Sequence, residues 1–276
     1  MASVTPMRSV PDHLTLPRLL ELEQLDRDLY RGDTVFEEPH SLYGGQVAAQ
    51  ALMAAGRTVA PDRPPHSLHG YFLRAGDAGR PTVFRVDRDR DGRTFSARRV
   101  AAVQDGEVIF SLSASFQVEE EGREHVTEDL PDAPGPEGLP PTPVPRLFSF
   151  EARLPPQPYP DSRWPTRFWA RCDAGLGDDR LLHSAVLTYL SDVFSGLSPL
   201  ADQEWSSQSS LDHALWFHRP ARLDDWVLLD MVPRTTGGGR GWYTGTITSP
   251  EGGLLASLAQ ETLFRRRRSA RGVTST

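Results

Sequence analysis

Two polar residues stand inside otherwise apolar patterns, and both have side chains suited to acid–base chemistry or to holding a water molecule. Asp192 lies in the segment Leu181–Phe194, and on a helical wheel it falls at the edge of the apolar side of that helix. Gln260 lies within the strand-like run Leu254–Phe264. A buried carboxylate is costly unless it is hydrogen-bonded, and a carboxamide brings both a donor and an acceptor. Asp192 is therefore a candidate general base and Gln260 a candidate water-holding group. The alternative for Asp192 is a carboxylate at the rim of the helix, and the alternative for Gln260 is a cross-strand hydrogen bond.

A third candidate is the Asp-His step at Asp212 and His213. Side chains alternate along a strand, so a strand from Ser209 to Trp216 places Asp212 and Ser210 on one face and His213 on the other. Because neighbours on a strand diverge, this step by itself does not form a catalytic dyad. A hydrogen-bonding Asp and a satisfied structural His remain the alternative interpretation.

The sequence lacks the residues that several other kinds of catalytic centre require. The chain has no lysine, which excludes Schiff-base chemistry and a Walker lysine, and it has no GxSxG elbow. Its single cysteine, Cys172, has no evident activating partner, and Gly237–Gly239 is not followed by the helical pattern of a phosphate loop. The spacing of His66 and His69 is not typical of a metal site. We therefore predict neither a metal ion nor an organic cofactor.

Composition indicates a globular protein without nucleic-acid partners. Of the 276 residues, 38% are hydrophobic and 24% are charged, and the formal net charge of −7 argues against nucleic-acid binding. No run approaches the roughly 18 apolar residues of a membrane span, and the first residues lack the apolar core of a signal peptide. One cysteine fits a reducing compartment. These features predict a cytoplasmic protein with no membrane span.

The chain contains two copies of one pattern, and the polar candidates lie in the second copy. The matching anchors are Ser67–Leu68 with Ser210–Leu211, at an offset of 143, and Ser111–Leu112 with Ser257–Leu258, at an offset of 146. Nearly equal offsets indicate a duplicated structural unit. In this alignment Asp212 replaces His69 and Gln260 replaces Ala114. We therefore expect one site, in the second copy.

Each copy is predicted to be an antiparallel sheet wrapped around a helix, which makes the fold class α+β. Helical patterns cover His13–Tyr30, Gln46–Val59 and Leu181–Phe194, and strand-like segments follow the second and third of these. A Pro- and Glu-rich stretch separates the copies. We divide the chain into an N-terminal unit at 14–118, a connector at 119–166, a C-terminal unit at 167–268 that carries the candidate catalytic residues, and a tail at 269–276.

Taken together, these motifs resemble the type II acyl-CoA thioesterase family. The matching residues are YGGQVAAQAL at Tyr43–Leu52, HSLHGYFLRAGD at His66–Asp77, DGRTFSARRVAAVQDGEVIFSLSASFQ at Asp91–Gln117, YLSDVF at Tyr189–Phe194, SLDHALWFHRP at Ser210–Pro220 and SLAQE at Ser257–Glu261. The resemblance implies a double hotdog fold, in which two helix-wrapped antiparallel sheets in tandem form one continuous sheet. It also implies hydrolysis of fatty acyl-CoA to free fatty acid and CoA.

The resemblance also implies roles for single residues. The family's catalytic carboxylate falls on Asp192, its hydroxyl on Ser210 and its glutamine on Gln260, and together they would hold the attacking water. The resemblance thus makes Ser210, rather than Asp212, the candidate catalytic residue of this strand, and Asp212 becomes a residue that supports the site. A main-chain N–H at the start of a hotdog helix is expected to stabilise the oxyanion, and arginines to bind the CoA phosphates. Further candidates for supporting the site or binding substrate are Gly45, Gln46 and His66.

Two other functions compete with thioester hydrolysis. A hotdog enoyl-CoA hydratase or dehydratase usually employs a helix-borne Asp-His pair, which neither copy has at helical spacing. A non-catalytic acyl-CoA binding or sensing protein has no need of the Asp, hydroxyl and Gln set. Acyl-CoA is the expected partner in each case, and the expected assembly is a homo-oligomer, either a dimer or a tetramer.

Overall fold

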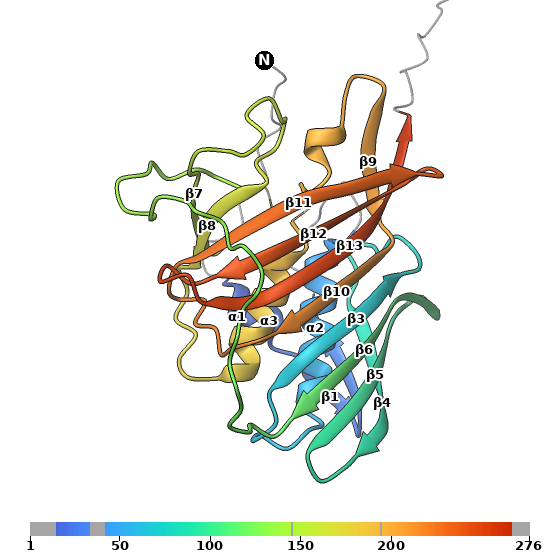
Figure 1. The fold of residues 1–276 in the computed structure, drawn as a ribbon. Coiled ribbons are helices and arrows are strands. Elements are labelled where there is room, and N and C mark those ends of the chain that lie inside the picture. The colour runs from blue at the N-terminus through green and yellow to red at the C-terminus, as the bar shows by residue number, and fades with distance from the viewer. Residues whose placement is uncertain (1–14, 34–41, 145, 194, 267–276) are drawn as a thin grey trace, which may run out of the picture.

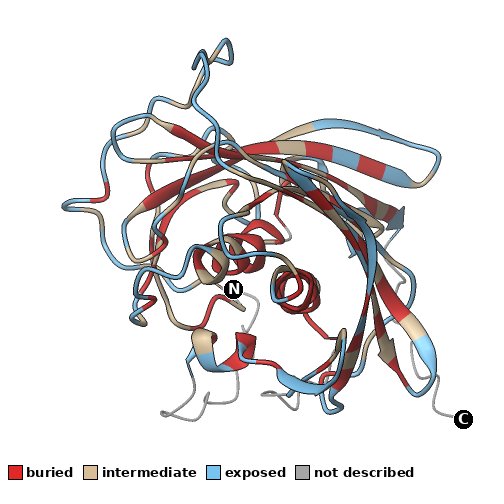
Figure 2. Ribbon diagram, turned by 90° about the horizontal axis from the view of Figure 1, so that it is seen from below, coloured by how far each residue is buried: buried red, intermediate tan, exposed pale blue. Residues whose placement is uncertain are grey.

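A single antiparallel sheet, curved around two helices, forms the body of the protein (Figure 1). The computed structural model describes residues 15–33, 42–144, 146–193 and 195–266. Within this part of the chain the strand order is β1-β2-β4-β5-β6-β3-β10-β13-β12-β11-β8-β7, with β9 paired to β13. Figure 2 shows both helices inside the curve of the sheet, with buried residues along them. The hydrophobic core therefore lies between the helices and the concave face of the sheet.

The elements follow one another in a similar order in the two halves. The first half comprises α1 (Leu16–Leu20), β1 (Glu23–Asp26), β2 (Leu29–Gly32), α2 (Gly44–Gly56), β3 (Pro65–Phe72), β4 (Thr82–Asp91), β5 (Phe95–Gln104) and β6 (Glu107–Gln117). The second half comprises β7 (Phe150–Arg153), β8 (Arg167–Cys172), α3 (Arg180–Ser191), the 3-10 helix η1 (Ser198–Leu200), β9 (Trp205–Ser210), β10 (Asp212–Phe217), β11 (Val227–Gly237), β12 (Arg240–Thr248) and β13 (Leu254–Arg266).

The two halves join at the antiparallel strand pair β3–β10, where Leu68 lies opposite Leu215. On the concave side, α2 and α3 pack against each other. The Tyr43 hydroxyl, just before α2, donates a hydrogen bond of 2.9 Å to the carbonyl of Tyr189 near the end of α3. The continuous sheet, with one enclosed helix from each half, confirms the predicted double hotdog fold.

Small residues let α2 lie deep in this arrangement. Ala48, Ala49 and Ala51 are completely buried, and a side chain at Gly56 would overlap Leu181 in the first turn of α3. The two helices can approach this closely because much of α2 consists of glycine and alanine. The alanine-rich pattern of the sequence thus sets the depth at which the start of α2 meets the end of α3.

The strand registers confirm one anchor of the internal repeat and correct the other. Gly106 and Gly252 both form a turn with left-handed φ, 79° and 83°, which supports the offset of 146. In the first half Leu68 lies opposite Ala114. In the second half the register Ala214–Ala259 places His213 opposite Gln260. The structural counterpart of His213 is therefore Leu68, so the alignment at an offset of 143 is wrong by two residues.

The first predicted helix is also wrong over most of its length. Helix α1 covers only Leu16–Leu20, and the antiparallel strands β1 and β2 follow it. A turn with Asp28 at φ 60° joins these strands. The apolar face that the helix would need is not continued, because Leu25 is exposed. Residues before Thr15 lie outside the described part of the chain.

Two further features concern the connector and the helices. The stretch 119–166 contributes one short strand, β7, which pairs with β8 at the edge of the sheet. No helix in the described ranges is long and apolar enough to cross a membrane.

Candidate active site

Asp192 ends α3 and faces the beginning of α2. The helix stops at Ser191, and Asp192 is its C-cap with φ −88° and ψ 21°, so the predicted helix to Phe194 is too long. The Asp192 side chain is nevertheless buried, with only 3% of its surface exposed. A carboxylate here lies next to the N-terminus of α2, where free main-chain N–H groups and the positive end of the helix dipole favour an anion.

Two glycines make this approach possible. The main-chain N–H of Gly45 donates a hydrogen bond to the Asp192 carboxylate. A Cβ atom on Gly44 would lie 2.5 Å from Asp192 Oδ2, and one on Gly45 would lie 2.5 Å from the carbonyl oxygen of Tyr189. Any larger residue at either position would therefore push the start of α2 away from the carboxylate.

Gln260 connects Asp192 to the rest of the cluster. Its amide nitrogen Nε2 donates to Asp192 Oδ1 at 2.9 Å and also to the hydroxyl of Ser210. Its carbonyl Oε1 accepts a hydrogen bond of 2.7 Å from His213 Nδ1. No part of Gln260 is exposed. Both ends of this buried carboxamide are thus satisfied, as its position inside an apolar strand requires.

A β-bulge explains why Ser210 and His213 both reach Gln260. Ser210 lies opposite Thr262, and Ala214 lies opposite Ala259. Four steps along β9–β10 therefore match three steps along β13, so one extra residue is inserted near Leu211. The predicted unbroken strand Ser209–Trp216 is wrong at this point. The inserted residue reverses the alternation, which brings His213 to the face of Ser210.

His213 is the residue of the cluster whose place the sequence did not reveal. It is buried, and burial lowers the pKa of its imidazole from 6.5 to about 4, against the opposing effects of Gln260 and Asp212. The ring is therefore neutral at neutral pH. Its Nδ1–H donates to Gln260, and Nε2 lies 2.8 Å from the Ser191 hydroxyl. Knowledge of the register between β10 and β13, which sets His213 opposite Gln260, would have placed His213 in the cluster.

Burial controls the ionisation of Asp192. It raises the pKa of this carboxyl from 3.8 to about 7. Hydrogen bonds from Gln260, Gly45 and Ser210, together with the positive charge of Arg146, oppose that rise. A carboxyl group with a pKa near neutrality is well matched to general-base catalysis, because it is partly ionised and still basic enough to accept a proton.

The other predicted residues lie in different surroundings. Asp212 does not face Ser210; its carboxylate accepts a hydrogen bond of 2.7 Å from the main-chain N–H of Glu261. Gln46 is buried in the first turn of α2. His66 contacts Ser115 Oγ at 2.7 Å and lines a separate cleft of about 300 Å³. The structure thus brings Asp192, Ser210, Gln260 and Gly45 together, and leaves His66 outside the cluster.

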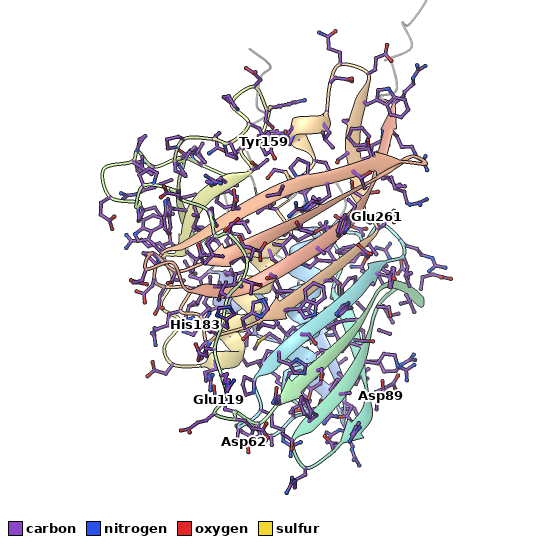
Figure 3. The ribbon with its side chains drawn as sticks, in the orientation of Figure 1. Asp62, Asp89, Glu119, Tyr159, His183 and Glu261 are labelled. Atoms are coloured by element: carbon purple, nitrogen blue, oxygen red, sulfur yellow. The ribbon has the colours of Figure 1, made fainter. Side chains whose placement is uncertain are left out.

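The separate cleft is partly closed by the connector. It lies among the start of β3, α3 and the segment after β10. Glu119, labelled in Figure 3, forms an ion pair with Arg180, and Glu124 forms one with Arg219 at 2.9 Å. Neither Asp192 nor Gln260 contributes to this cleft.

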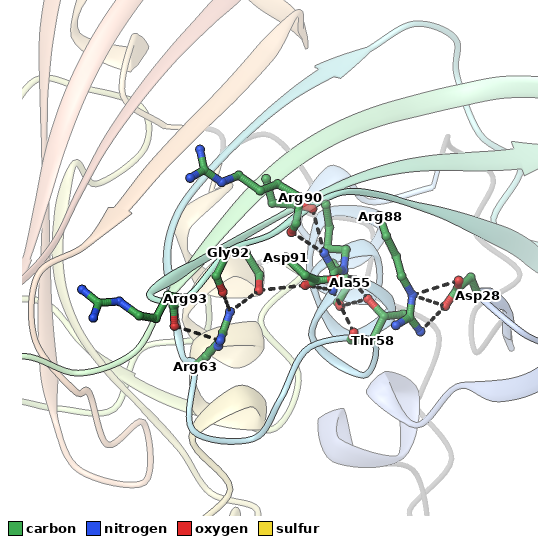
Figure 4. A network of polar contacts seen from close by, with 12 residues as sticks. Asp28, Ala55, Thr58, Arg63, Arg88, Arg90, Asp91, Gly92 and Arg93 are labelled. Carbon is green, nitrogen blue, oxygen red and sulfur yellow. Dashed lines mark hydrogen bonds and ion pairs between the residues drawn. The ribbon is translucent and has the colours of Figure 1, made fainter.

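The corresponding place in the first half holds no such cluster. Apolar Leu68 and Ala114 occupy the positions of His213 and Gln260. Beside them the fully buried Arg98 donates to Thr58 Oγ1 at 2.7 Å and to Asp91 Oδ1 at 2.7 Å, in the network of Figure 4. This half therefore offers a structural ion pair where the second half offers a carboxylate of near-neutral pKa.

Fold and cluster together define a double hotdog protein with a buried polar cluster in its second half. Two family models match the chain: the acyl-CoA thioesterase N-terminal domain over residues 36–117 and the acyl-CoA thioesterase C-terminal domain over residues 127–264. The chain therefore belongs to the type II acyl-CoA thioesterase family, a family of thioester hydrolases.

Individual relatives agree with this assignment. The chain is 34% identical to acyl-coenzyme A thioesterase 8 of Homo sapiens, over 90% of this chain and 88% of that protein. It is also 34% identical to acyl-CoA thioesterase 2 of Haemophilus influenzae, over 91% and 96% respectively. The crystal structure of the acyl-CoA thioesterase II TesB2 from Mycobacterium marinum is similar, with a TM-score of 0.78 and 41% identity, covering 92% of this chain and 98% of that one.

Proposed function

We propose that this protein hydrolyses fatty acyl-CoA to free fatty acid and CoA with a water molecule held by Asp192, Ser210 and Gln260. The observation that carries the proposal is the bridge that the Gln260 amide forms between the Asp192 carboxylate and the Ser210 hydroxyl. Relatives of similar length are named acyl-CoA thioesterases, which supports acyl-CoA as the substrate.

The chemistry follows from the ionisation of Asp192. Its carboxylate accepts a proton from the water as the water oxygen attacks the thioester carbonyl carbon. The tetrahedral oxyanion then collapses, the C–S bond breaks, and the departing sulfur takes the proton back from Asp192. One water is consumed, and one acid and one thiol are formed. No covalent bond to the protein is made at any step.

Substrate enters the cluster from the side of Ser210 and Gly44. These two residues are half-buried, whereas Asp192 and Gln260 are buried. Ser210 and the start of α2 thus form the part of the site nearest to solvent. Since the chain has no lysine, arginines bind the phosphates of CoA. We also infer that the protein acts in the cytoplasm and that it forms a homo-oligomer. Size-exclusion chromatography with light scattering tests the oligomeric state.

The contacts of His213 weigh against the hydratase alternative. Its ring nitrogens contact Gln260 and Ser191, so His213 and Asp192 are not directly hydrogen-bonded to each other. A non-catalytic binding protein is disfavoured because it needs no carboxyl group with a pKa near neutrality.

One panel of substrates tests the proposal. Acyl-CoA esters from acetyl to palmitoyl are incubated with the protein, and free thiol release is followed in parallel with enoyl absorbance. We expect thiol release with at least one saturated ester. Change in double-bond absorbance without thiol release would favour the hydratase function, and tight binding without turnover would favour the binding function.

A further inference from the structure

The hydroxyl of Tyr243 is a buried polar group without a hydrogen-bond partner among the residues that the structure describes. Tyr243 lies in β12, and only 1% of its surface is exposed. A buried hydroxyl that has lost water and gained no partner destabilises the folded protein. Such a group is retained at a cost, which calls for an explanation beyond packing.

Tyr243 lies beside the proposed catalytic cluster. It stands directly opposite Gln260 in the pairing of β12 with β13, so both side chains point to the helix side of the sheet. Its ring packs on the turn that follows Asp192, where a side chain at Gly196 would overlap it. Burial, followed by the charges of Asp192 and Asp212, raises the pKa of Tyr243 well above 10. The hydroxyl therefore keeps its proton and is a hydrogen-bond donor.

Three neighbouring donors already have acceptors. The Gly45 N–H, the kind of main-chain donor expected to stabilise an oxyanion, bonds to the Asp192 carboxylate. The Tyr43 hydroxyl donates to the Tyr189 carbonyl at 2.9 Å, and the Tyr189 hydroxyl donates to the Arg146 carbonyl at 2.6 Å. The proposed hydrolysis forms a tetrahedral oxyanion, and such an anion needs a donor that is in place beforehand.

The first half of the chain provides an internal comparison. There the residue of β5 opposite Ala114 is Arg98, which corresponds to Tyr243 opposite Gln260. The guanidinium of Arg98 is as deeply buried as Tyr243, yet it is fully used. Its acceptors are Thr58 Oγ1, the carbonyls of Thr58, Arg90 and Ala97, and Asp91 Oδ1. The polar side chain at this position thus has hydrogen-bond partners in the half without the cluster, whereas the Tyr243 hydroxyl, in the half with the cluster, has none among the described residues.

We propose that the Tyr243 hydroxyl donates a hydrogen bond to the carbonyl oxygen of the bound thioester and stabilises the oxyanion that forms there. The inference rests on the proposed thioester hydrolysis. The missing partner of Tyr243 is then an atom of the substrate. Tyr243 acts on the carbonyl oxygen, whereas Asp192, Ser210 and Gln260 act on the water.

The test is Tyr243→Phe, which removes only the hydroxyl. We expect kcat to fall by roughly 10–10³-fold, as for loss of one oxyanion donor, and KM to rise by no more than several-fold, from loss of the hydrogen bond to the ground-state carbonyl. Because the unpaired hydroxyl is gone, we expect Tm to stay the same or rise. The control is Tyr30→Phe, a buried tyrosine of β2 in the first half, which should keep the wild-type kcat.

Two non-hydrolysable analogues locate the contact. An S-alkyl CoA thioether has no carbonyl oxygen, and we expect the variant to bind it as the wild type does. A ketone analogue, with CH₂ in place of the sulfur, keeps the carbonyl, and we expect the variant to bind it several-fold more weakly.

A wild-type kcat in Tyr243→Phe would overturn the inference, and so would a lowered Tm or equal loss of affinity for both analogues. A shift of the acidic limb of the pH–rate profile, without a lower plateau, would also overturn it, because the hydroxyl would then act through Asp192. The proposed hydrolysis is judged separately, since its failure would show as absence of thiol release by the wild-type protein.

Discussion

Asp192 Oδ1 lies 2.9 Å from the amide nitrogen of Gln260, although one residue ends a helix and the other lies in a strand 68 positions later. This contact orders the Gln260 amide, because its nitrogen faces the carboxylate and its oxygen faces His213. The amide can then direct a second N–H toward the Ser210 hydroxyl. The proposed water-binding corner of the site thus depends on hydrogen bonds at both the nitrogen and the oxygen of one carboxamide.

Replacing Asp192 with Asn should nearly abolish hydrolysis. Asn is close in shape to Asp but does not accept a proton at neutral pH, so the loss should be on the order of 10²-fold or more. Thiol release from the best acyl-CoA ester measures it. The matched control is Asp62→Asn, an exposed carboxylate in the first half that Figure 3 shows well away from Glu261 on β13. Activity of Asp192→Asn within a few-fold of wild type would remove Asp192 as the base.

The sequence patterns led directly to some parts of this site. Asp192 and Gln260 stood out because each polar side chain interrupts an apolar pattern, and such a side chain needs partners wherever the fold places it. The helix-wrapped antiparallel sheet of each half was also predictable, since a helical pattern followed by alternating strands occurs twice, and the resemblance to the family added the double hotdog arrangement. These features are local, so a single stretch of sequence carries them.

Other parts depend on contacts between distant segments. The bulge near Leu211 is decided by how β13 pairs with both β9 and β10, so alternation within one segment predicted the wrong face for His213. The requirement for glycine at position 44 comes from Asp192, which is far away in the sequence. In the same way, Asp28 lies in the turn of a hairpin whose second strand pairs with the distant strand β4, where a leucine periodicity had suggested helix.

The pH dependence of kcat/KM should report the ionisation of Asp192. The pKa of this carboxyl is raised to about 7, so below that pH the proposed base is protonated and should be inactive. We expect kcat/KM to rise with pH up to about 7 and then to level off. His213 contributes no limb in this range, because its pKa is lowered to about 4. An acidic limb centred near the ordinary carboxyl value of 3.8 would show that Asp192 is not buried in the free enzyme.

The same shift predicts how pH affects folding stability. Asp192 has a higher pKa in the folded protein, about 7, than the 3.8 of an unfolded chain. Its contribution to stability is therefore full below pH 3.8 and is lost as the pH rises to 7. At about 1.4 kcal/mol per pKa unit, the loss is on the order of 4 kcal/mol.

Asp192→Asn removes this loss, so its unfolding free energy relative to wild type should increase between pH 5 and pH 8. Urea unfolding at the two pH values measures the difference. A constant difference between the two proteins would contradict the raised pKa.

Gly44→Ala should impair the site through a single methyl group. That methyl carbon would lie 2.5 Å from Asp192 Oδ2 and close to the ring of Phe72, so the start of α2 must move away from the carboxylate. We expect at least a tenfold loss of kcat, comparable to misplacement of one well-oriented polar group. Gly122→Ala is the control, because a methyl there meets nothing within 4 Å. Equal activity of the two variants would show that Gly44 is not needed for the approach.

Ser210→Ala and Gln260→Ala should each lower the rate of hydrolysis by roughly 10–10³-fold, and the two losses should not add. Both residues are proposed to hold one water, so removing either already misplaces it. The double variant should then be little slower than the worse single variant. Single-turnover rates of all four proteins complete the cycle, and affinity for a thioether analogue is measured separately.

A role in binding alone gives a different pattern. Affinity for the analogue would fall, the changes in free energy would add, and single-turnover rates at saturating substrate would stay near the wild-type value. His218→Ala is a useful control, because His218 contacts Ser257 outside the cluster. Additive rate losses for Ser210 and Gln260 would show that the two residues do not share a water, and Asp192 would then be the one member of the cluster with an assigned step in the reaction.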